Sequence, residues 1–219
     1  MDRKRHLRSS ACSMLHLYHC AHARSFRVLW FLEELGLSYD LQVMEFPPRQ
    51  HAPDYLAINP LGTVPYLVDG TTELSESIAI LQYLDSVHGK GEFSFAPGDK
   101  DYAQWLNWLL YGEASLMPPL ATILRYRLFA PEEGLNEAVA TAHERVLRTR
   151  LCPLESALAN TAFLCPAGFS TADISVGYAL LLARAIGLGT LLGEVTSRYF
   201  QRLESRPAFR AAVARQSLR

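Results

Sequence analysis

Apolar residues in the first 90 positions follow two spacings in turn, one typical of strands and one typical of helices. Short apolar runs predict strands at residues 15–19, 39–44, 64–68 and 73–74, the last two joined as a hairpin by a DGTT turn. Apolar residues three or four positions apart predict helices at residues 26–35, at 54–58 and from Ser75 onward. The FPPRQHAP segment, residues 46–53, is expected to be a loop. This order predicts a mixed sheet covered by helices.

The strand pattern does not return after residue 100, and the rest of the chain is predicted to be helical. Residues 89–99 are rich in glycine and charge and are interpreted as a linker. Helical spacing follows at residues 102–111, 120–129, 135–158, 174–186 and 197–204. Pro118-Pro119 is expected to break or kink the helical region in which it lies. The fold prediction is an α/β domain over residues 14–88 and an all-helical domain over residues 100–219.

The nearly apolar stretch from residue 174 to 193 has the hydropathy of a membrane span but not the length. Ser170 and Asp173 form a capping pattern before it, and Gly187 offers a stop after it. The helix between them has about 14 residues, whereas a bilayer needs about 20. The charge of Arg184 is also costly in a membrane. We therefore expect a buried core helix and no membrane partner.

Composition narrows the class of partner and the compartment. With 20% charged residues and a net charge of -1, the chain gives no electrostatic reason to expect nucleic acid, so a small molecule or a protein is the expected partner. The four cysteines are far apart and form no CxxC pair, so neither a metal site nor a dithiol pair is predicted. Together with the lack of a secretory signal, this predicts a cytoplasmic protein. Residues 1–13 are basic and are interpreted as a disordered tail or as residues before a true start at Met14, with a transit peptide as the less favoured alternative.

Two motifs of the first domain occur in a fixed order. The run NPLGTVP spans residues 59–65, and Glu76-Ser77 follows at a helix start. With an all-helical second domain, this pair resembles the cytosolic glutathione transferases over residues 14–215, and we expect a bacterial-type member. The resemblance implies a thioredoxin-like N-terminal domain and an all-α C-terminal helical bundle, usually as a homodimer. It implies that the thiolate of glutathione, the co-substrate, is conjugated to a small hydrophobic electrophile.

The Val64-Pro65 pair interrupts the start of a predicted strand. A cis bond before the proline is expected to leave the N–H and C=O of Val64 exposed. An extended tripeptide along that edge would be held by main-chain hydrogen bonds, and the resemblance places the cysteinyl unit of glutathione there. A purely structural turn proline is the alternative.

The other glutathione contacts are expected at a helix start and in a loop. Ser77 and free N–H groups of the first turn are expected to bind the γ-glutamyl carboxylate, and Glu76 its ammonium group. Alternatively, Glu76 complements the helix dipole and Ser77 is a cap. Gln50 and His51, with Arg49 adjoining, occupy the loop position where relatives bind the glycine carboxylate; a solvated loop is the alternative.

The turn after the first strand is expected to stabilise the glutathione thiolate. Many relatives have a Ser or Cys four or five residues before the helix arginine that Arg27 resembles. Counting back gives Ala23 and His22, which have neither a hydroxyl nor a thiol. For each residue considered for this role, an ordinary loop side chain that faces water is an equally favoured interpretation. The candidates, in order of preference, are His22, main-chain N–H groups with Arg24, Cys20 as a mixed disulfide, and Ser25, which is expected to point into the fold.

The co-substrate is expected between the two domains. There the resemblance and the Pro118-Pro119 irregularity favour an adaptable apolar pocket lined by Tyr111, Met117 and Tyr126, although such residues are core by default. Two other functions stay open. A non-catalytic glutathione-binding carrier or interaction protein is favoured by the missing Ser, and a thiol-disulfide or peroxidase activity rests on Cys20.

Overall fold

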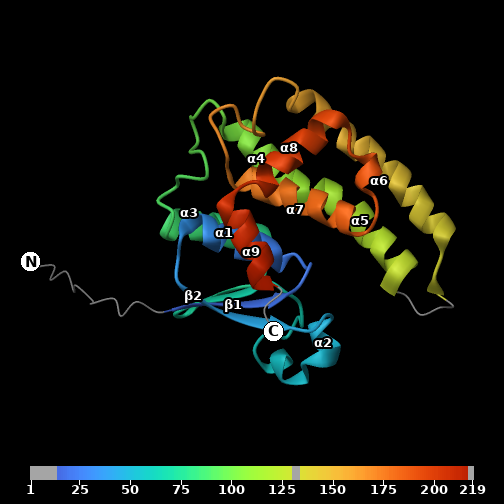
Figure 1. Ribbon diagram of the computed structural model, residues 1–219. Helices are drawn as coiled ribbons and strands as arrows, with labels where there is room; N and C mark the ends of the chain where they lie inside the picture. Colours follow the sequence, from blue (N-terminus) through green and yellow to red (C-terminus); the bar gives the residue numbers. More distant parts are fainter. Residues whose placement is uncertain (1–13, 130–133, 217–219) are drawn as a thin grey trace, which may run out of the picture.

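A computed structural model describes residues 14–129 and 134–216, which form a sheet-containing domain at one end and a helical domain at the other (Figure 1). The strands are β1 (Leu15–Cys20), β2 (Tyr39–Met44), β3 (Tyr66–Asp69) and β4 (Thr72–Leu74). Their order in the sheet is β2-β1-β3-β4. β1 is parallel to β2 and antiparallel to β3, and β4 is antiparallel to β3. The expected mixed, thioredoxin-like sheet is confirmed.

The strand directions bring four chain segments to one edge of the sheet. β1 and β2 end together, with Cys20 opposite Met44. β3 begins at this edge, because Tyr66 pairs with Tyr18 near the end of β1. β4 ends at the same edge, because Leu74 pairs with Leu67 near the start of β3. The segments that follow or precede these ends are residues 21–24, 45–51, 63–65 and 75–77, and we call their common location the β1-end edge.

Helices α1 (Ser25–Leu35) and α3 (Ser77–Val87) belong to the first domain. α1 ends at Gly36, whose φ of 62° is the left-handed conformation that glycine adopts without strain. The segment expected to be a loop at residues 46–53 instead contains a short helix, α2 (Pro48–His51), followed by the 3-10 turn Pro53–Ala57. Pro48 at the first helical position favours this start, since its fixed φ suits a helix.

The helical domain begins with one long helical path. α4 (Tyr102–Tyr111) leads into the π segment Gly112–Leu116, then α5 (Met117–Leu124) and the π segment Arg125–Phe129. The helical path is not broken at Pro118-Pro119: both prolines lie in the first turn of α5, and the irregularity beside them is the preceding π segment. A first-turn proline loses little, since its missing N–H would have no regular α-helical partner there.

Four helices complete this domain: α6 (Glu137–Ala157), α7 (Thr171–Ala185), α8 (Glu194–Glu204) and α9 (Pro207–Gln216). α7 is the expected core helix, with its capping box formed by Ser170 and Asp173. α9 was not anticipated from the sequence. Within residues 14–129 and 134–216, no helix combines the length and apolarity that crossing a membrane requires.

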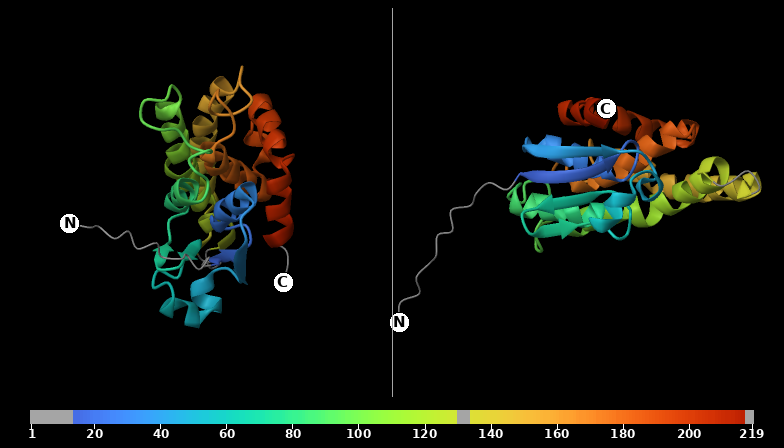
Figure 2. Two further views of the ribbon diagram at one scale, coloured as in Figure 1. Left: turned by 90° about the vertical axis from the view of Figure 1, so that its left-hand side faces the viewer. Right: turned by 90° about the horizontal axis from the view of Figure 1, so that it is seen from below.

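The last helix returns to the first domain. Figures 1 and 2 show α9 beside α1 in more than one view. The ring of Phe209 in α9 packs edge-on against Trp30 and Phe26 of α1, at centroid distances of 4.9 and 5.4 Å. The guanidinium of Arg206 forms two hydrogen bonds, 2.6 and 2.8 Å, to the carboxylate of Glu34. α1 is therefore enclosed by the sheet, by α7 and by α9.

Candidate active site at the end of the first strand

The NPLGTVP run folds into a turn that its own side chains hold. Asn59 donates from Nδ2 to the Thr63 carbonyl at 2.8 Å and accepts from the Leu61 N–H at 3.1 Å. The Tyr55 hydroxyl also donates to the Thr63 carbonyl, at 2.7 Å. Gly62 has a φ of 60°, and a Cβ there would lie 2.8 Å from the side chain of Leu56. Asn59 and Gly62 are thus explained by the turn itself.

The residue after this turn presents an open main chain. The expected cis bond between Val64 and Pro65 is confirmed. Pro65 is buried and Val64 half-buried, directly before the start of β3. Neither the N–H nor the C=O of Val64 has a hydrogen-bond partner among the residues that the structure describes. An extended peptide at this position would find one main-chain donor and one acceptor.

Ser77 begins α3 at the same edge and rests on a buried cation. Its side chain is 4% exposed, and its Oγ accepts a hydrogen bond of 3.2 Å from Nη1 of Arg27. A serine oxygen that accepts in this way still has its own proton to donate. The preceding residue, Glu76, is exposed and has an extended backbone, as an N-cap residue does.

Arg27 is fully buried in α1 and joins the two domains. It pairs with the carboxylate of Glu113 in the π segment of the long helical path, and its Nη2 and Nε donate to the Ser175 carbonyl at 3.1 and 3.3 Å. Its guanidinium also lies 4.7 Å from the ring centre of Tyr178. Burial lowers the pKa of Arg27, and the neighbouring Glu113 opposes this effect. Ser77 therefore accepts its hydrogen bond from a buried guanidinium that several other contacts hold in place.

Arg24 also pairs with the carboxylate of Glu113. Its Nε donates to both carboxylate oxygens of Glu113, at 2.9 and 3.1 Å. The positive charge of Arg24 is therefore partly neutralised by Glu113. The group of Arg24, Arg27 and Glu113 has one net positive charge, and it lies at the start of α1, where the helix dipole has the same sign.

His22 lies in the turn between β1 and α1 and is exposed. Its φ of 60° is the left-handed conformation, which is uncommon for a residue other than glycine. Its N–H donates to Oε1 of Gln216 at 3.2 Å, and its carbonyl accepts from the Tyr178 hydroxyl at 3.0 Å. No described residue forms a hydrogen bond to its ring, so the imidazole is open to a ligand.

Ser25 and Cys20 form hydrogen bonds with each other, and both side chains are buried. Both are 0% exposed, and the Ser25 hydroxyl bonds to the N–H and the carbonyl of Cys20, each at 3.3 Å. Ser25 points into the fold, as expected. Burial raises the pKa of the Cys20 thiol to about 12, so this group is a protonated, enclosed thiol. This burial does not favour the mixed disulfide considered for Cys20.

Main-chain donors are present at the start of α1. The N–H groups of Arg24 and Ser25 have no acceptor within the described part of the chain. The first N–H groups of a helix point out of its N-terminal end and bind anions. A thiolate held at the β1-end edge would therefore have His22 and these two N–H groups as its nearest candidate donors.

α2 places its exposed residues on the segment that follows β2. Gln50 and His51 are both exposed, and Nδ1 of His51 lies 4.0 Å from a carboxylate oxygen of Glu45. Arg49 donates to the Leu61 carbonyl at 2.6 Å. Arg49 therefore fastens α2 to the NPLGTVP turn, and Gln50 and His51 are exposed at its surface.

The three residues expected to line the co-substrate pocket have different environments. Met117 is 1% exposed and packs in the hydrophobic core, so the expectation that it lines an open pocket is wrong. The hydroxyl of Tyr111 donates to the Arg150 carbonyl at 2.9 Å. Tyr126 is half-buried in the second π segment, with Arg125 over its ring. Tyr111 and Tyr126 thus retain accessible surface, whereas Met117 does not.

Two exposed aromatic residues instead meet between the domains. Phe46 follows β2 and is 49% exposed, and Phe129 ends the second π segment and is 61% exposed. Their ring centres are 5.7 Å apart. Phe46 adjoins Glu45, whose carbonyl lies 3.7 Å from the Cys20 sulfur, so the pair is beside the turn that carries His22. The sequence pattern did not distinguish Phe46 from an ordinary loop residue.

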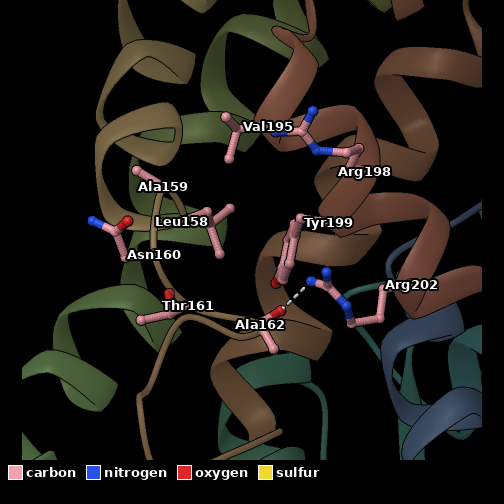
Figure 3. Close-up of a pocket in the computed structure, with 9 residues that line it drawn as sticks. All are labelled: Leu158, Ala159, Asn160, Thr161, Ala162, Val195, Arg198, Tyr199 and Arg202. Atoms are coloured by element: carbon pink, nitrogen blue, oxygen red, sulfur yellow. Dashed lines mark hydrogen bonds between the residues drawn. The ribbon is translucent and has the colours of Figure 1, made fainter.

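Two cavities lie away from the β1-end edge. One, of about 360 Å³, is formed between the end of α6 and α8 (Figure 3). There Nη1 of Arg202 donates to the Ala162 carbonyl at 2.6 Å, and Nη1 of Arg198 pairs with Glu194. The other, of about 570 Å³, lies between Phe95 and Pro166. Neither includes a residue of the β1-end edge. Among the described residues, no group of three or more His, Cys, Asp or Glu side chains is placed to hold a metal ion.

Comparisons with known proteins agree with this geometry. The family model for the N-terminal domain of glutathione S-transferases matches residues 13–86. Glutathione S-transferase 4 of Zea mays is 34% identical over 188 residues, 83% of each chain. Glutathione S-transferase GstB of Escherichia coli strain K12 is 30% identical over 193 residues, 85% of this chain and 91% of that one. A glutathione transferase structure from Methylococcus capsulatus has a TM-score of 0.80 at 25% identity and covers 94% of this chain and 100% of that one. The chain belongs to the glutathione S-transferase family.

Proposed function

We propose that this protein binds glutathione at the β1-end edge and conjugates its thiolate to a small hydrophobic electrophile. The observation that carries the proposal is the unpaired main chain of Val64 beside Ser77, which rests on the buried Arg27. Val64 takes the cysteinyl unit. Ser77 and the first N–H groups of α3 take the γ-glutamyl carboxylate, and Glu76 its ammonium group. Gln50 and His51 on α2 take the glycine carboxylate.

The thiolate is stabilised by the start of α1. A free thiol has a pKa of about 8.5, and lowering it to about 7 requires roughly 2 kcal/mol. His22, the N–H groups of Arg24 and Ser25, and the net positive charge of the Arg24–Glu113–Arg27 group together can supply this amount. The protein is thus proposed as a bacterial-type member that uses no Ser or Cys donor at this helix start. The alternative of a thiol-disulfide activity is less favoured, because the Cys20 side chain on which it rests is buried.

The electrophile is held beside the thiolate by exposed aromatic side chains. Phe46 and Phe129 provide the apolar surface. Tyr111 and Tyr126, on the long helical path, are kept as proposed contacts because both retain accessible surface. Aromatic faces of this kind favour a flat apolar co-substrate. We also retain the expectations of a homodimer, of a cytoplasmic location, and of domains at residues 14–88 and 100–219 joined by residues 89–99.

Substitution of the α3 start tests the binding site. Glu76→Ala and Ser77→Ala are each expected to weaken glutathione binding by about 1–3 kcal/mol, roughly 5- to 150-fold, because each leaves a charged group of the ligand without its partner. Isothermal titration calorimetry measures the affinity. Ser86→Ala, an exposed serine in the same helix, is the control and should bind as the wild type does. Wild-type affinity in both test variants, with the fold intact, would remove the proposed site.

A second measurement identifies the group that stabilises the thiolate. If His22 donates to the sulfur, His22→Ala should raise the pKa of bound glutathione by about one unit, since one unit corresponds to 1.36 kcal/mol. Ser25→Ala should change this pKa little, because the Ser25 hydroxyl is bonded to Cys20. The thiolate absorbance, followed as a function of pH, gives both values. An unchanged pKa in His22→Ala would assign the role to the main-chain N–H groups. A large rise in Ser25→Ala alone would contradict this assignment.

A further inference from the structure

The turn that carries His22 is held from outside its own domain. Main-chain hydrogen bonds of the turn involve Ala23, whose N–H donates to the Cys20 carbonyl at 3.2 Å and whose carbonyl accepts from the Phe26 N–H at 2.9 Å. The peptide groups on both sides of His22 are bonded instead to the helical domain, the N–H to Gln216 at 3.2 Å and the C=O to Tyr178 at 3.0 Å. These partners are 194 and 156 residues away in the sequence.

The left-handed backbone of His22 needs such support. A residue with a side chain at a φ near 60° is less stable than in its ordinary conformations by about 1 kcal/mol or more. It persists where the surroundings fix both adjoining peptide groups. Gln216 and Tyr178 fix one each, and both are nearly buried, at 6% and 2% exposed.

Both partners are themselves firmly placed. Tyr178 lies in the core helix α7, and its ring contacts the guanidinium of the buried Arg27 at 4.7 Å. Gln216 is the last residue of α9, which is docked onto α1. Next to it, Arg215 pairs with Glu33 of α1 at 2.8 Å. Glu33 lies in the last turn of α1, so this ion pair fastens the end of α9 to α1 in addition to the contact of Gln216 with the His22 turn.

We infer that Gln216 and Tyr178 are positioning residues that fix the His22 turn for thiolate stabilisation. By holding the peptide groups around His22, they keep its imidazole outward and keep the N–H groups of Arg24 and Ser25 directed at the β1-end edge. This inference rests on the proposed function. It assigns to α9 a part in the chemistry, although neither Gln216 nor Tyr178 is among the proposed glutathione contacts.

The test removes each hydrogen bond with little change of shape. Gln216→Met keeps the length of the side chain and loses the acceptor, and Tyr178→Phe keeps the ring and loses the hydroxyl. Each is expected to raise the pKa of bound glutathione by about 0.5 to 1 unit. The turnover number for an aryl halide at pH 6.5 should then fall about 3- to 10-fold, because less of the thiol is ionised. The loss should shrink as the pH rises, and the KM for glutathione should change less than about 2-fold, since Val64 and Ser77 are untouched.

Matched controls separate positioning from general destabilisation. Gln201→Met changes an exposed glutamine of α8. Tyr199→Phe removes a buried hydroxyl bonded to Asp173 at 2.8 Å, far from the turn. Both controls should keep the wild-type pH profile. An unchanged thiol pKa in the folded Gln216→Met/Tyr178→Phe double variant, or an equal shift in the controls, would overturn the inference. An ordinary thiol pKa in wild-type protein that binds glutathione would instead overturn the proposed function.

Discussion

Replacing Arg27 with methionine is expected to lower the free energy of unfolding by about 3–5 kcal/mol, because it breaks a buried ion pair by removing one partner. The guanidinium is fully buried and serves three acceptors: the carboxylate of Glu113, the carbonyl of Ser175 and the hydroxyl oxygen of Ser77. Methionine fills most of the volume but donates to none of them. A buried acceptor without a donor costs about 1–3 kcal/mol, and the carboxylate keeps only Arg24.

Urea unfolding followed by circular dichroism measures this loss. Arg145→Met is the control, since Arg145 is an exposed residue of α6, and it should change the free energy of unfolding by less than about 0.5 kcal/mol. The loss in Arg27→Met should come with weaker glutathione binding, because Ser77 loses its support. A loss below about 1 kcal/mol would show that the three contacts are replaced by water or by repacking, and that Arg27 is not the link between the domains.

The location of the proposed glutathione site could be predicted from the sequence because it follows from the directions of the strands. Once the pattern indicates two parallel strands followed by a hairpin, the ends of β1, β2 and β4 and the start of β3 must meet at one edge. The NPLGTVP run and Glu76-Ser77 lie next to these ends, so their proximity needed no knowledge of side-chain packing. Short-range signals sufficed for the α7 cap as well, since Ser170 and Asp173 are three residues apart.

The contributions of the helical domain to the site could not be predicted in this way. α9 buries Phe209, Ala212 and Gln216, a face with one large apolar residue, so it has no apolar stripe that periodicity could detect. The pairing of Arg27 with Glu113 joins residues 86 positions apart, and local patterns contain no information about such contacts.

Two residues with similar sequence contexts differ in their burial in the folded protein. Met117 and Phe46 are both large and apolar, and both adjoin prolines. Met117 begins α5 inside the helical domain and is 1% exposed, whereas Phe46 follows β2 and is 49% exposed. Which of them is accessible depends on how the two domains pack, and local sequence patterns contain no information about that packing.

His19 should make the protein lose stability in mild acid. It lies in β1 opposite Val43 and is 0% exposed, and neither ring nitrogen has a hydrogen-bond partner in the described residues. Burial, and next the nearby His22, lower its pKa from 6.5 to about 4. Between these two values the unfolded chain binds a proton that the folded chain excludes. Protonation of the unfolded chain therefore does not affect the free energy of unfolding above pH 6.5. It lowers this free energy increasingly as the pH falls toward 4.

The difference between these pKa values corresponds to roughly 3 kcal/mol, at 1.36 kcal/mol per unit. His19→Leu, which cannot bind the proton, should therefore gain stability relative to the wild type as the pH falls from 7 to 4, by up to that amount. The comparison with the variant is necessary because Asp173 acts in the opposite sense: burial raises its pKa to about 6, so its contribution is lost as the pH rises from about 4 to 6. That contribution is common to both proteins and cancels in the difference. Urea unfolding at half-unit intervals of pH gives the two curves. If they run parallel from pH 7 to pH 4, His19 titrates normally in the folded protein and is not enclosed as described.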